Sequence, residues 1–309
     1  YNGGNDSADT AFKVSQISKK LNYPINCIAI PKTVDNDLAL TDCCPGFGSA
    51  AKYIATSTLE ASLDVQSMSE TSTKVFILEV MGRHAGWMAA SSALARSEEG
   101  DAPHIILLPE NTFNQKNFLL TVKKIVKKNG FCVVVVSEGV KNSKGKFLSE
   151  SSTKDAFGHA QLGGVAPYLA KLVSEKLKLK NHWAVSDYLQ RSARHIASKT
   201  DLDHAEAVGV HAVKYAVQGM NGVMPIIVRG KGKKYSWKIE PALLSKIANL
   251  EKKLPKAFIG KNGMDVTSKA INYLSPLIEG ESFPNFKKGI PEIKKLKLIE
   301  VKKKLPLWR

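Results

Sequence analysis

The sequence lacks any apolar run of about 18 residues, the length that a membrane-spanning helix needs. Its first residues, Tyr1 to Asp6, lack the charged and then apolar layout of a signal peptide. Cysteine is scarce, and its positions show neither zinc-knuckle spacing nor the density of a secreted disulfide scaffold: Cys27, Cys43, Cys44 and Cys132. We therefore expect free thiols, no membrane association and a cytoplasmic location.

Acidic residues are few beside the basic ones, 28 against 45, which gives a formal net charge of +17. Such an excess is compatible with nucleic acid, an anionic membrane surface or phosphorylated small molecules. Much of the lysine lies in the last third and between Lys123 and Lys128, without zinc-finger spacing or a basic-aromatic module. A nucleic-acid-binding protein would rest on charge alone, so we expect a solvated surface and no nucleic-acid partner.

Short apolar runs alternate with helix-like segments in this chain of 309 residues, 43% hydrophobic and 24% charged. The runs short enough for buried strands are Cys27 to Ile30, Val75 to Val80, Ile105 to Leu108, Cys132 to Val136 and Val223 to Val228. The helix-like segments are Asp9 to Leu21, Ser49 to Leu63, Ala85 to Ala95, Phe118 to Lys128, Val165 to Leu177 and His204 to Gln218. This alternation predicts an α/β fold with a parallel sheet.

Polar residues follow several of these runs, where a parallel sheet binds its ligands. They are Pro31 to Asp37, Met81 to Arg83, Ser137 to Gly139 and, after Val185, Asp187 to Arg191. The first of these segments combines an ammonium, a hydroxyl and carboxylates in one short loop. Asp35 could take a proton from a sugar hydroxyl, and Lys32 could neutralise a transferring phosphoryl group. A plain surface turn is the competing interpretation, because Pro, Asn and Asp are common in turns.

The run Pro31-Lys32-Thr33-Val34-Asp35-Asn36-Asp37 resembles the active-site signature of the phosphofructokinase family. The resemblance continues in Thr41-Asp42 with Gly46-Phe47, Glu79 to Gly86, Ser137-Glu138-Gly139 and Tyr188 to Ser192, in the family's order and across most of the chain. It implies two Rossmann-like parallel-sheet domains. We expect residues 1–48 plus 190–230 to form the donor-binding domain and residues 49–189 the sugar-phosphate domain. Residues 231–309 would be a basic, peripheral C-terminal extension.

The resemblance also implies roles for these residues in a glycolytic phosphotransferase that acts on fructose 6-phosphate. Asp35 would be the base for the 1-hydroxyl, and Arg83 would lie near the transferred phosphate. Glu138 would accept hydrogen bonds from the sugar, and Tyr188 with Arg191 would bind the 6-phosphate end. The remaining substrate contacts would be Thr33, Val34, Asp37, Met81 and Gly82.

Asp6 and Lys32 distinguish phosphoryl donors within the family. ATP users generally have glycine at both places, so the carboxylate of Asp6 would repel ATP while pyrophosphate still fits. Lys32 would supply charge that a nucleotide site arranges otherwise. The donor-binding set is Gly4, Asp6, Ser7 and Lys32. We therefore expect pyrophosphate: fructose 6-phosphate 1-phosphotransferase activity, which is reversible; the alternatives are an ATP-dependent 6-phosphofructokinase and a non-catalytic regulatory subunit.

Magnesium and a homo-oligomer are further expectations from the resemblance. Asn5 stands where many members have an aspartate near the metal, and an amide is a poorer ligand for Mg²⁺ than a carboxylate, so Asp6 or Asp37 are the alternative ligands. Lys74 and His182 stand where bacterial relatives place arginines that reach a neighbouring subunit's substrate, which suggests a homodimer or homotetramer. Family members also carry a glycine-rich segment before the Gly3-Gly4 turn, so we expect a missing N-terminal segment and an incomplete first domain.

Overall fold

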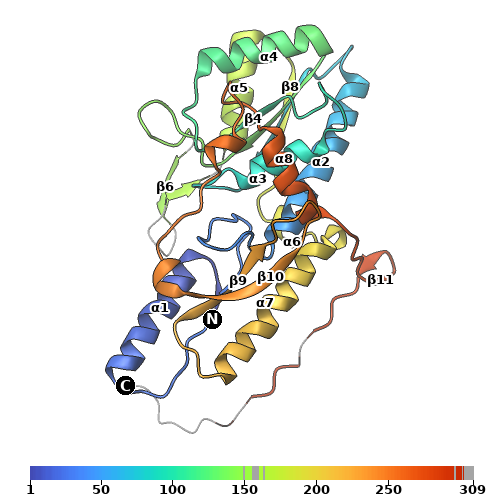
Figure 1. Cartoon of the computed structure of the whole chain (residues 1–309). Coiled ribbons are helices and arrows are strands. Elements are labelled where there is room, and N and C mark those ends of the chain that lie inside the picture. The colour runs from blue at the N-terminus through green and yellow to red at the C-terminus, as the bar shows by residue number, and fades with distance from the viewer. Residues whose placement is uncertain (149, 155–159, 163, 296, 301, 303–309) are drawn as a thin grey trace.

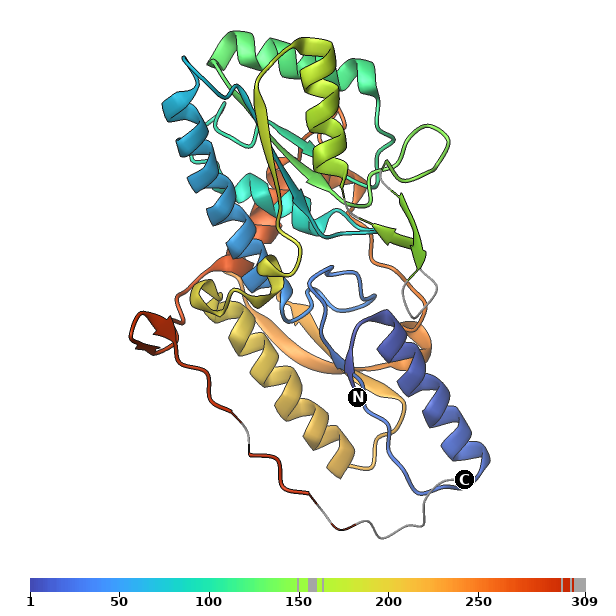
Figure 2. The same ribbon diagram turned by 180° about the vertical axis from the view of Figure 1, so that it is seen from behind.

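Two stacked lobes make up the protein in the computed structural model, which describes residues 1–148, 150–154, 160–162, 164–295, 297–300 and 302 (Figures 1 and 2). One lobe contains a four-stranded sheet with the order β4-β5-β3-β8, in which every neighbouring pair is parallel. The strands are β3 (Val75–Val80), β4 (Ile105–Leu107), β5 (Cys132–Ser137) and β8 (Asn181–Val185). The predicted α/β class with a parallel sheet is therefore confirmed.

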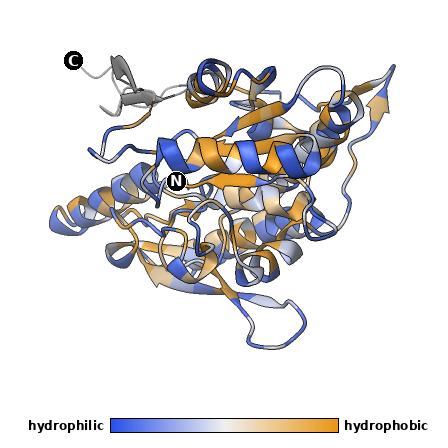
Figure 3. Ribbon diagram, turned by 90° about the horizontal axis from the view of Figure 1, so that it is seen from above, coloured by the Kyte–Doolittle hydropathy of each residue, from blue (hydrophilic) through white to orange (hydrophobic). Residues whose placement is uncertain are grey.

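Helices cover both faces of this sheet because its central strand, β5, is buried along its whole length. The helices α4 (Gln115–Asn129) and α5 (Val165–Leu177) pack on one face. The helices α2 (Phe47–Met68) and α3 (Trp87–Ser91), the latter continued by the 3-10 turn η1 (Ser92–Ala95), pack on the other. Seen from above and coloured by hydropathy, the strands form an apolar layer between helices with polar outer faces (Figure 3).

The second lobe is built around β1 (Asn2–Gly3), β2 (Ile30–Pro31), β9 (Val223–Arg229) and β10 (Trp237–Leu243). Strands β1 and β2 are parallel, and a bridge from Ile28 to Val223 joins this pair to β9. On one face, α1 (Asn5–Lys20) buries Ala8 and Ala11, and on the other, α7 (Lys199–Val217) buries Ala212 and Tyr215. β10 pairs with β9 in antiparallel fashion, a strand that the predicted parallel pattern did not include.

The expected peripheral position of the segment after Lys231 is wrong for its first half. β10 completes the second lobe, and Leu244 and Ile247 are buried in that lobe's core. Helix α8 (Ser268–Leu274) then packs its buried Ala270 and Leu274 against the α2 and α3 face of the first lobe. These apolar residues are spaced among exposed lysines, so the composition hid their contribution to both cores. The proposed division into domains stays a prediction.

Local signals explain both ends of α4. The Asn114 side chain accepts a hydrogen bond from the Asn117 backbone at 3.0 Å to begin α4, and the left-handed Gly130 ends it. Lys127 and Lys128 in its last turn complement the helix dipole, which agrees with a solvated role for this basic cluster. The other described α-helix and strands are α6 (Leu189–Ser192), β6 (Glu150–Lys154), β7 (Ala160–Leu162), β11 (Phe286–Lys287) and β12 (Ile290–Pro291).

The structure bears on the thiols and on membrane-spanning segments. All four cysteines are free, as expected. In the part of the chain that the structure describes, no helix is both long and apolar enough to cross a lipid bilayer.

Candidate active site

The predicted donor residues lie on two adjacent turns of the second lobe. Gly3 pairs with Pro31, and the Lys32 amide donates to the Gly3 carbonyl at 3.2 Å. A Cβ added to Gly4 would lie 3.7 Å from the Cβ of Thr33, an ordinary van der Waals contact, so the two turns lie side by side. The pairing therefore sets Lys32 beside the amino end of α1, where unpaired backbone N–H groups favour an anion.

Asp6 and Lys32 both have exposed side chains. Asp6 lies in the first turn of α1, and no ion pair joins it to Lys32 among the described residues. Ser7 fills the space inside the turn, because a Cβ added to Gly3 would lie 2.0 Å from the Ser7 hydroxyl oxygen. The structure thus brings the predicted donor residues to neighbouring turns, with the side chains of Asp6 and Lys32 exposed to solvent.

The carboxyl of Asp35 lies at the centre of a charged cluster. Burial and the negative charge of Asp37 raise its pKa to about 6, while Arg83, His84 and Arg191 act in the opposite direction. Burial also raises the pKa of Asp37. An isolated surface aspartate would be ionised far below this range, so the surroundings of Asp35 differ from those of an exposed turn residue.

Asn36 lies between these two carboxylates, so its backbone conformation affects the directions in which their side chains point. Its backbone is left-handed, with a φ of 54°, which is uncommon for a residue other than glycine. It is fully buried, and its side-chain oxygen accepts a hydrogen bond from the Cys44 amide at 2.9 Å. The Thr33 hydroxyl in turn accepts from the Asp35 amide at 3.2 Å, so the loop is fixed from within at both ends.

The predicted sugar-binding residues meet where β3 and β5 end. The Gly82 amide donates to Glu138 at 3.2 Å, and the Met81 amide donates to Gln190 at 3.3 Å. A Cβ added to Gly139 would lie 2.0 Å from the Arg83 carbonyl oxygen, so only glycine permits this approach. Burial, together with the charges of Asp35 and Glu79, raises the pKa of Glu138 to about 7.

Tyr188 and Arg191 lie on the turn after β8, and both are exposed. The Arg191 guanidinium carbon lies 4.0 Å from the centre of the Tyr188 ring, which pairs the cation with the aromatic face. Because Arg191 also acts on the pKa of Asp35, the turn faces the same site.

Lys74 and His182 lie away from this cluster within the chain. Lys74 immediately precedes β3, at the end opposite to Met81, and its ammonium donates to the carbonyls of Ser69 and Glu70. His182 is exposed on the edge strand β8, paired with Phe76. The structure does not bring these residues to the site of the same chain, and their contact with a neighbouring subunit stays a prediction.

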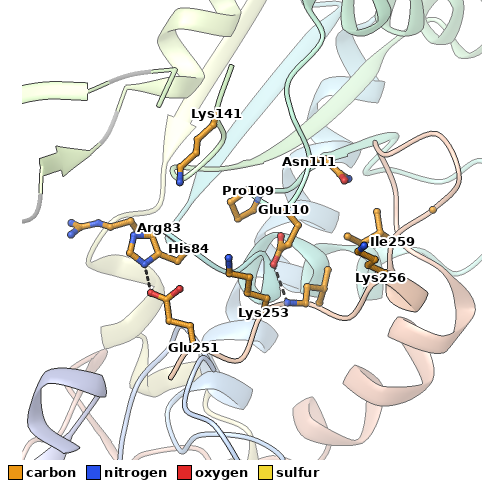
Figure 4. Close-up of a pocket in the computed structure, with 12 residues that line it drawn as sticks. Arg83, His84, Pro109, Glu110, Asn111, Lys141, Glu251, Lys253, Lys256 and Ile259 are labelled. Atoms are coloured by element: carbon orange, nitrogen blue, oxygen red, sulfur yellow. Dashed lines mark hydrogen bonds and ion pairs between the residues drawn. The ribbon is translucent and has the colours of Figure 1, made fainter. Parts of the chain in front are cut away.

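A cavity of about 740 Å³ opens beside the Arg83–His84 turn (Figure 4). Glu110, Lys141 and the segment from Glu251 to Gly260 form most of its wall, and His84 and Glu251 are hydrogen bonded there. Asp35, Asp37 and Glu138 do not line it. The cavity is therefore a neighbour of the predicted reaction centre, which lies instead at these half-buried carboxylates.

Comparison with known proteins supports the family. A sequence model described as Phosphofructokinase matches residues 1–216. The chain belongs to the phosphofructokinase family. A relative from Xanthomonas campestris named pyrophosphate–fructose 6-phosphate 1-phosphotransferase is 56% identical over 310 residues, covering 100% of this chain and 74% of the relative. A relative of the same name from Halomonas elongata is also 56% identical, with the same coverage.

Solved phosphofructokinase structures are similar to this chain as well. The crystal structure of a pyrophosphate-dependent phosphofructokinase from Marinobacter aquaeolei superposes with a TM-score of 0.90 at 56% identity, covering 99% of this chain and 74% of that one. The phosphofructokinase from Saccharomyces cerevisiae, at 19% identity and a TM-score of 0.56, supports the fold alone.

Two residues that contact the signature loop or the Arg83–His84 turn were not predicted from the sequence. Glu251 bonds to His84, and Lys252 bonds to Asn36 and to the backbone around Asp42. No sequence motif marks them, because they lie in a lysine-rich stretch far from the signature. By contrast, Trp87 packs in the core between Phe47 and Phe258.

Proposed function

We propose that the protein transfers a phosphoryl group from pyrophosphate to the 1-hydroxyl of fructose 6-phosphate, giving fructose 1,6-bisphosphate and orthophosphate in a reversible reaction. The observation that carries the proposal is the Asp35 cluster, a half-buried carboxyl with a pKa raised to about 6 among Arg83, His84 and Arg191. Relatives with 56% identity that bear the corresponding name support the choice of donor and acceptor.

In this reaction Asp35 takes the proton of the 1-hydroxyl as that oxygen bonds to the phosphorus. A base with a pKa near 6 is ionised at neutral pH and is still basic enough to accept a proton. The bond from phosphorus to the bridging oxygen breaks, and orthophosphate leaves. Arg83 and Lys32 stabilise the negative charge on the transferring group, as cations do in phosphoryl-transfer sites.

The sugar is held by groups on the first lobe. Glu138 accepts hydrogen bonds from sugar hydroxyls, in the same position where it now accepts one from Gly82. Tyr188 and Arg191 bind the 6-phosphate, for which the planar guanidinium offers two parallel hydrogen bonds. The Met81–Arg83 backbone and the Thr33, Val34 and Asp37 side chains complete the contacts.

Pyrophosphate is favoured over ATP because of the negative charge at Asp6. Two charges ~4 Å apart repel by about 4 kcal/mol at an effective dielectric of 20, and by about 1 kcal/mol in bulk water. Asp6 is exposed, so the repulsion lies nearer the lower value until a bound ligand displaces water. The amino end of α1 and the Lys32 ammonium still attract the smaller anion.

Magnesium is the metal that this chemistry implies, and the donor set fits it. The Asn5 side-chain oxygen is buried without a hydrogen-bond partner in the structure, while its nitrogen donates to Asp37 at 3.4 Å. Among the described residues, no group of three or more His, Cys, Asp or Glu side chains could hold a metal alone. Mg²⁺ often uses only one or two carboxylates plus substrate phosphates, so Asp37 or Asp6, with Asn5, would suffice. When bound, it would neutralise pyrophosphate.

The cytoplasmic location and the homodimer or homotetramer expected from the sequence stay predictions. An assembly would give Lys74 and His182 a role, because His182 lies on the exposed edge of the sheet. The size of the assembly can be measured by light scattering of the purified protein.

A coupled assay tests the proposed donor. Fructose 6-phosphate should be phosphorylated with pyrophosphate and Mg²⁺, with at least ~100-fold lower kcat/KM for ATP, a ratio to which the charge of exposed Asp6 contributes about tenfold. The change Asp6→Gly should raise kcat/KM for ATP about tenfold, and Asp9→Gly, the same change one turn later in α1, should leave the ATP rate unchanged. A wild-type enzyme that uses ATP but not pyrophosphate would refute the proposal, and a folded protein inactive with both donors would favour a regulatory subunit.

A further inference from the structure

The segment from Glu251 to Leu254 crosses between the two loops of the proposed reaction. Glu251 forms an antiparallel bridge with Leu38, and the Lys252 amide donates to the Asp37 carbonyl at 2.6 Å. On the other side, the Lys252 carbonyl accepts from the Trp87 indole at 2.8 Å. The segment is therefore tied by its backbone to the catalytic loop and to the helix that follows Arg83.

The side chain of Lys252 is directed into the catalytic loop. Its ammonium donates to the carbonyls of Asp42 at 2.7 Å and Thr41 at 2.9 Å, and to the Asn36 side chain at 3.2 Å. An ammonium has three N–H donors, so all of them are used. Among the described residues, no carboxylate lies within ion-pair distance of Lys252. Its charge is thus turned toward the backbone of the loop rather than paired on the surface.

The Asn36 contact matters most, because Asn36 separates Asp35 from Asp37. Its left-handed backbone persists only if the surroundings hold it. The Cys44 amide and the Lys252 ammonium share its side-chain oxygen, so one of the two bonds that fix Asn36 comes from a residue 216 positions away.

Glu251 makes the corresponding contact on the sugar side. Its carboxylate is hydrogen bonded to His84 Nδ1, next to Arg83 (Figure 4). Leu254 extends the connection, because its amide and the Gly86 amide both donate to the same oxygen of Glu110, at 3.0 and 2.9 Å. Adjacent residues of one segment thus contact the base loop and the sugar-binding turn.

We propose that Glu251 and Lys252 are positioning residues: Lys252 holds Asp35 in line with the sugar hydroxyl through Asn36, and Glu251 holds the Arg83–His84 turn. This inference rests on the proposed function. It follows that loss of the Lys252 contact lowers kcat, because the base moves, whereas loss of the Glu251 contact weakens sugar binding. Misplacement by about 1 Å can lower a rate ~100-fold, so effects of this order are within reach.

Steady-state kinetics with pyrophosphate and fructose 6-phosphate test the proposal. Lys252→Gln should lower kcat about 30-fold with KM for the sugar within about twofold, and Lys252→Arg, which keeps the charge, should recover most of the loss. Lys246→Gln, at an exposed lysine six residues before Lys252, is the matched control and should have wild-type kinetics. A purely structural lysine would lower the amount of folded enzyme without changing kcat per active site, which overturns the proposal.

Glu251→Gln provides the second measurement if Lys252→Gln does not fold. It should raise KM for fructose 6-phosphate about fivefold with kcat within about twofold, and an unchanged KM would overturn the inference. The wild type separates this test from the proposed function. If the wild type uses only ATP, the donor is wrong and the same comparisons are made with ATP; if it is inactive with both donors, both proposals fail.

Discussion

The residues proposed for the donor and those proposed for the base and the sugar have opposite surroundings. Asp6 and Lys32 are exposed, on turns joined by a short backbone pairing. Asp35 and Glu138 lie in surroundings that exclude enough water to raise their pKa values to about 6 and about 7. One side offers charge to a small anion from solvent, and the other offers carboxyls tuned for proton transfer and hydrogen bonding.

This difference in solvent exposure agrees with the chemistry that each set of residues would perform in the proposed reaction. A base requires a pKa near the working pH, and burial is the most direct way to raise that of a carboxyl. Attraction of a doubly or triply charged anion requires only accessible cations and backbone N–H groups, which water screens but does not abolish. Substitutions on the two sides should therefore differ in size and in salt dependence.

The largest effect is expected for Asp35→Asn. The amide keeps the size of the side chain but cannot accept the hydroxyl proton, so kcat should fall about 1,000-fold, within the range for loss of a general base, while KM for the sugar changes little. Initial rates in both directions of the reaction measure this. Asp64→Asn, at an exposed aspartate of α2, is the control. A variant with a tenth or more of wild-type kcat would exclude Asp35 as the base.

A smaller effect, about 100-fold in kcat, is expected for Lys32→Met, which removes one stabilising cation from the transferring group. Because Lys32 is exposed, its contribution should also be screened, so added KCl should slow the wild type more than the variant. Rates at several salt concentrations measure both. The control is Lys20→Met at the exposed end of α1. Equal salt dependence of variant and wild type would contradict the proposed role of Lys32.

The buried strands and the signature loop were the predictable parts of the molecule. β3 and α5 have the predicted bounds because a continuous apolar run and a clear helical period each point to one structure. β8 was not predicted as a strand, since it is an edge strand with exposed His182 and Trp183 and no apolar run. Its sequence signal is therefore weak even though it belongs to the central sheet.

The residues around the signature loop were less predictable than the loop itself. Lys252 and Lys253 are neighbours of the same type, yet only Lys252 turns toward the catalytic loop, while Lys253 is exposed at the cavity. Nothing local distinguishes them, because the choice is made by carbonyls of Thr41 and Asp42 that are distant in sequence. Sequence motifs indicate the residues that react or bind, whereas the residues that hold them in place are set by tertiary contacts and cannot be read from a motif.

The smallest expected effect is on the stability of the fold rather than on the rate, and it also distinguishes the two sides. In the folded protein the pKa of Asp35 is raised from 3.8 to about 6, so its ionised form disfavours folding. This destabilisation is absent below about pH 4, where both states are protonated, grows between pH 4 and 6, and is complete above pH 6. Asp35→Asn removes it and should stabilise the fold at pH 8 by about 1 kcal/mol, allowing for partial solvent access. Urea unfolding at pH 8, 6 and 5 should show a gain that shrinks as the pH falls, and no gain is expected for exposed Asp6→Asn; a gain independent of pH would mean that burial does not tune Asp35.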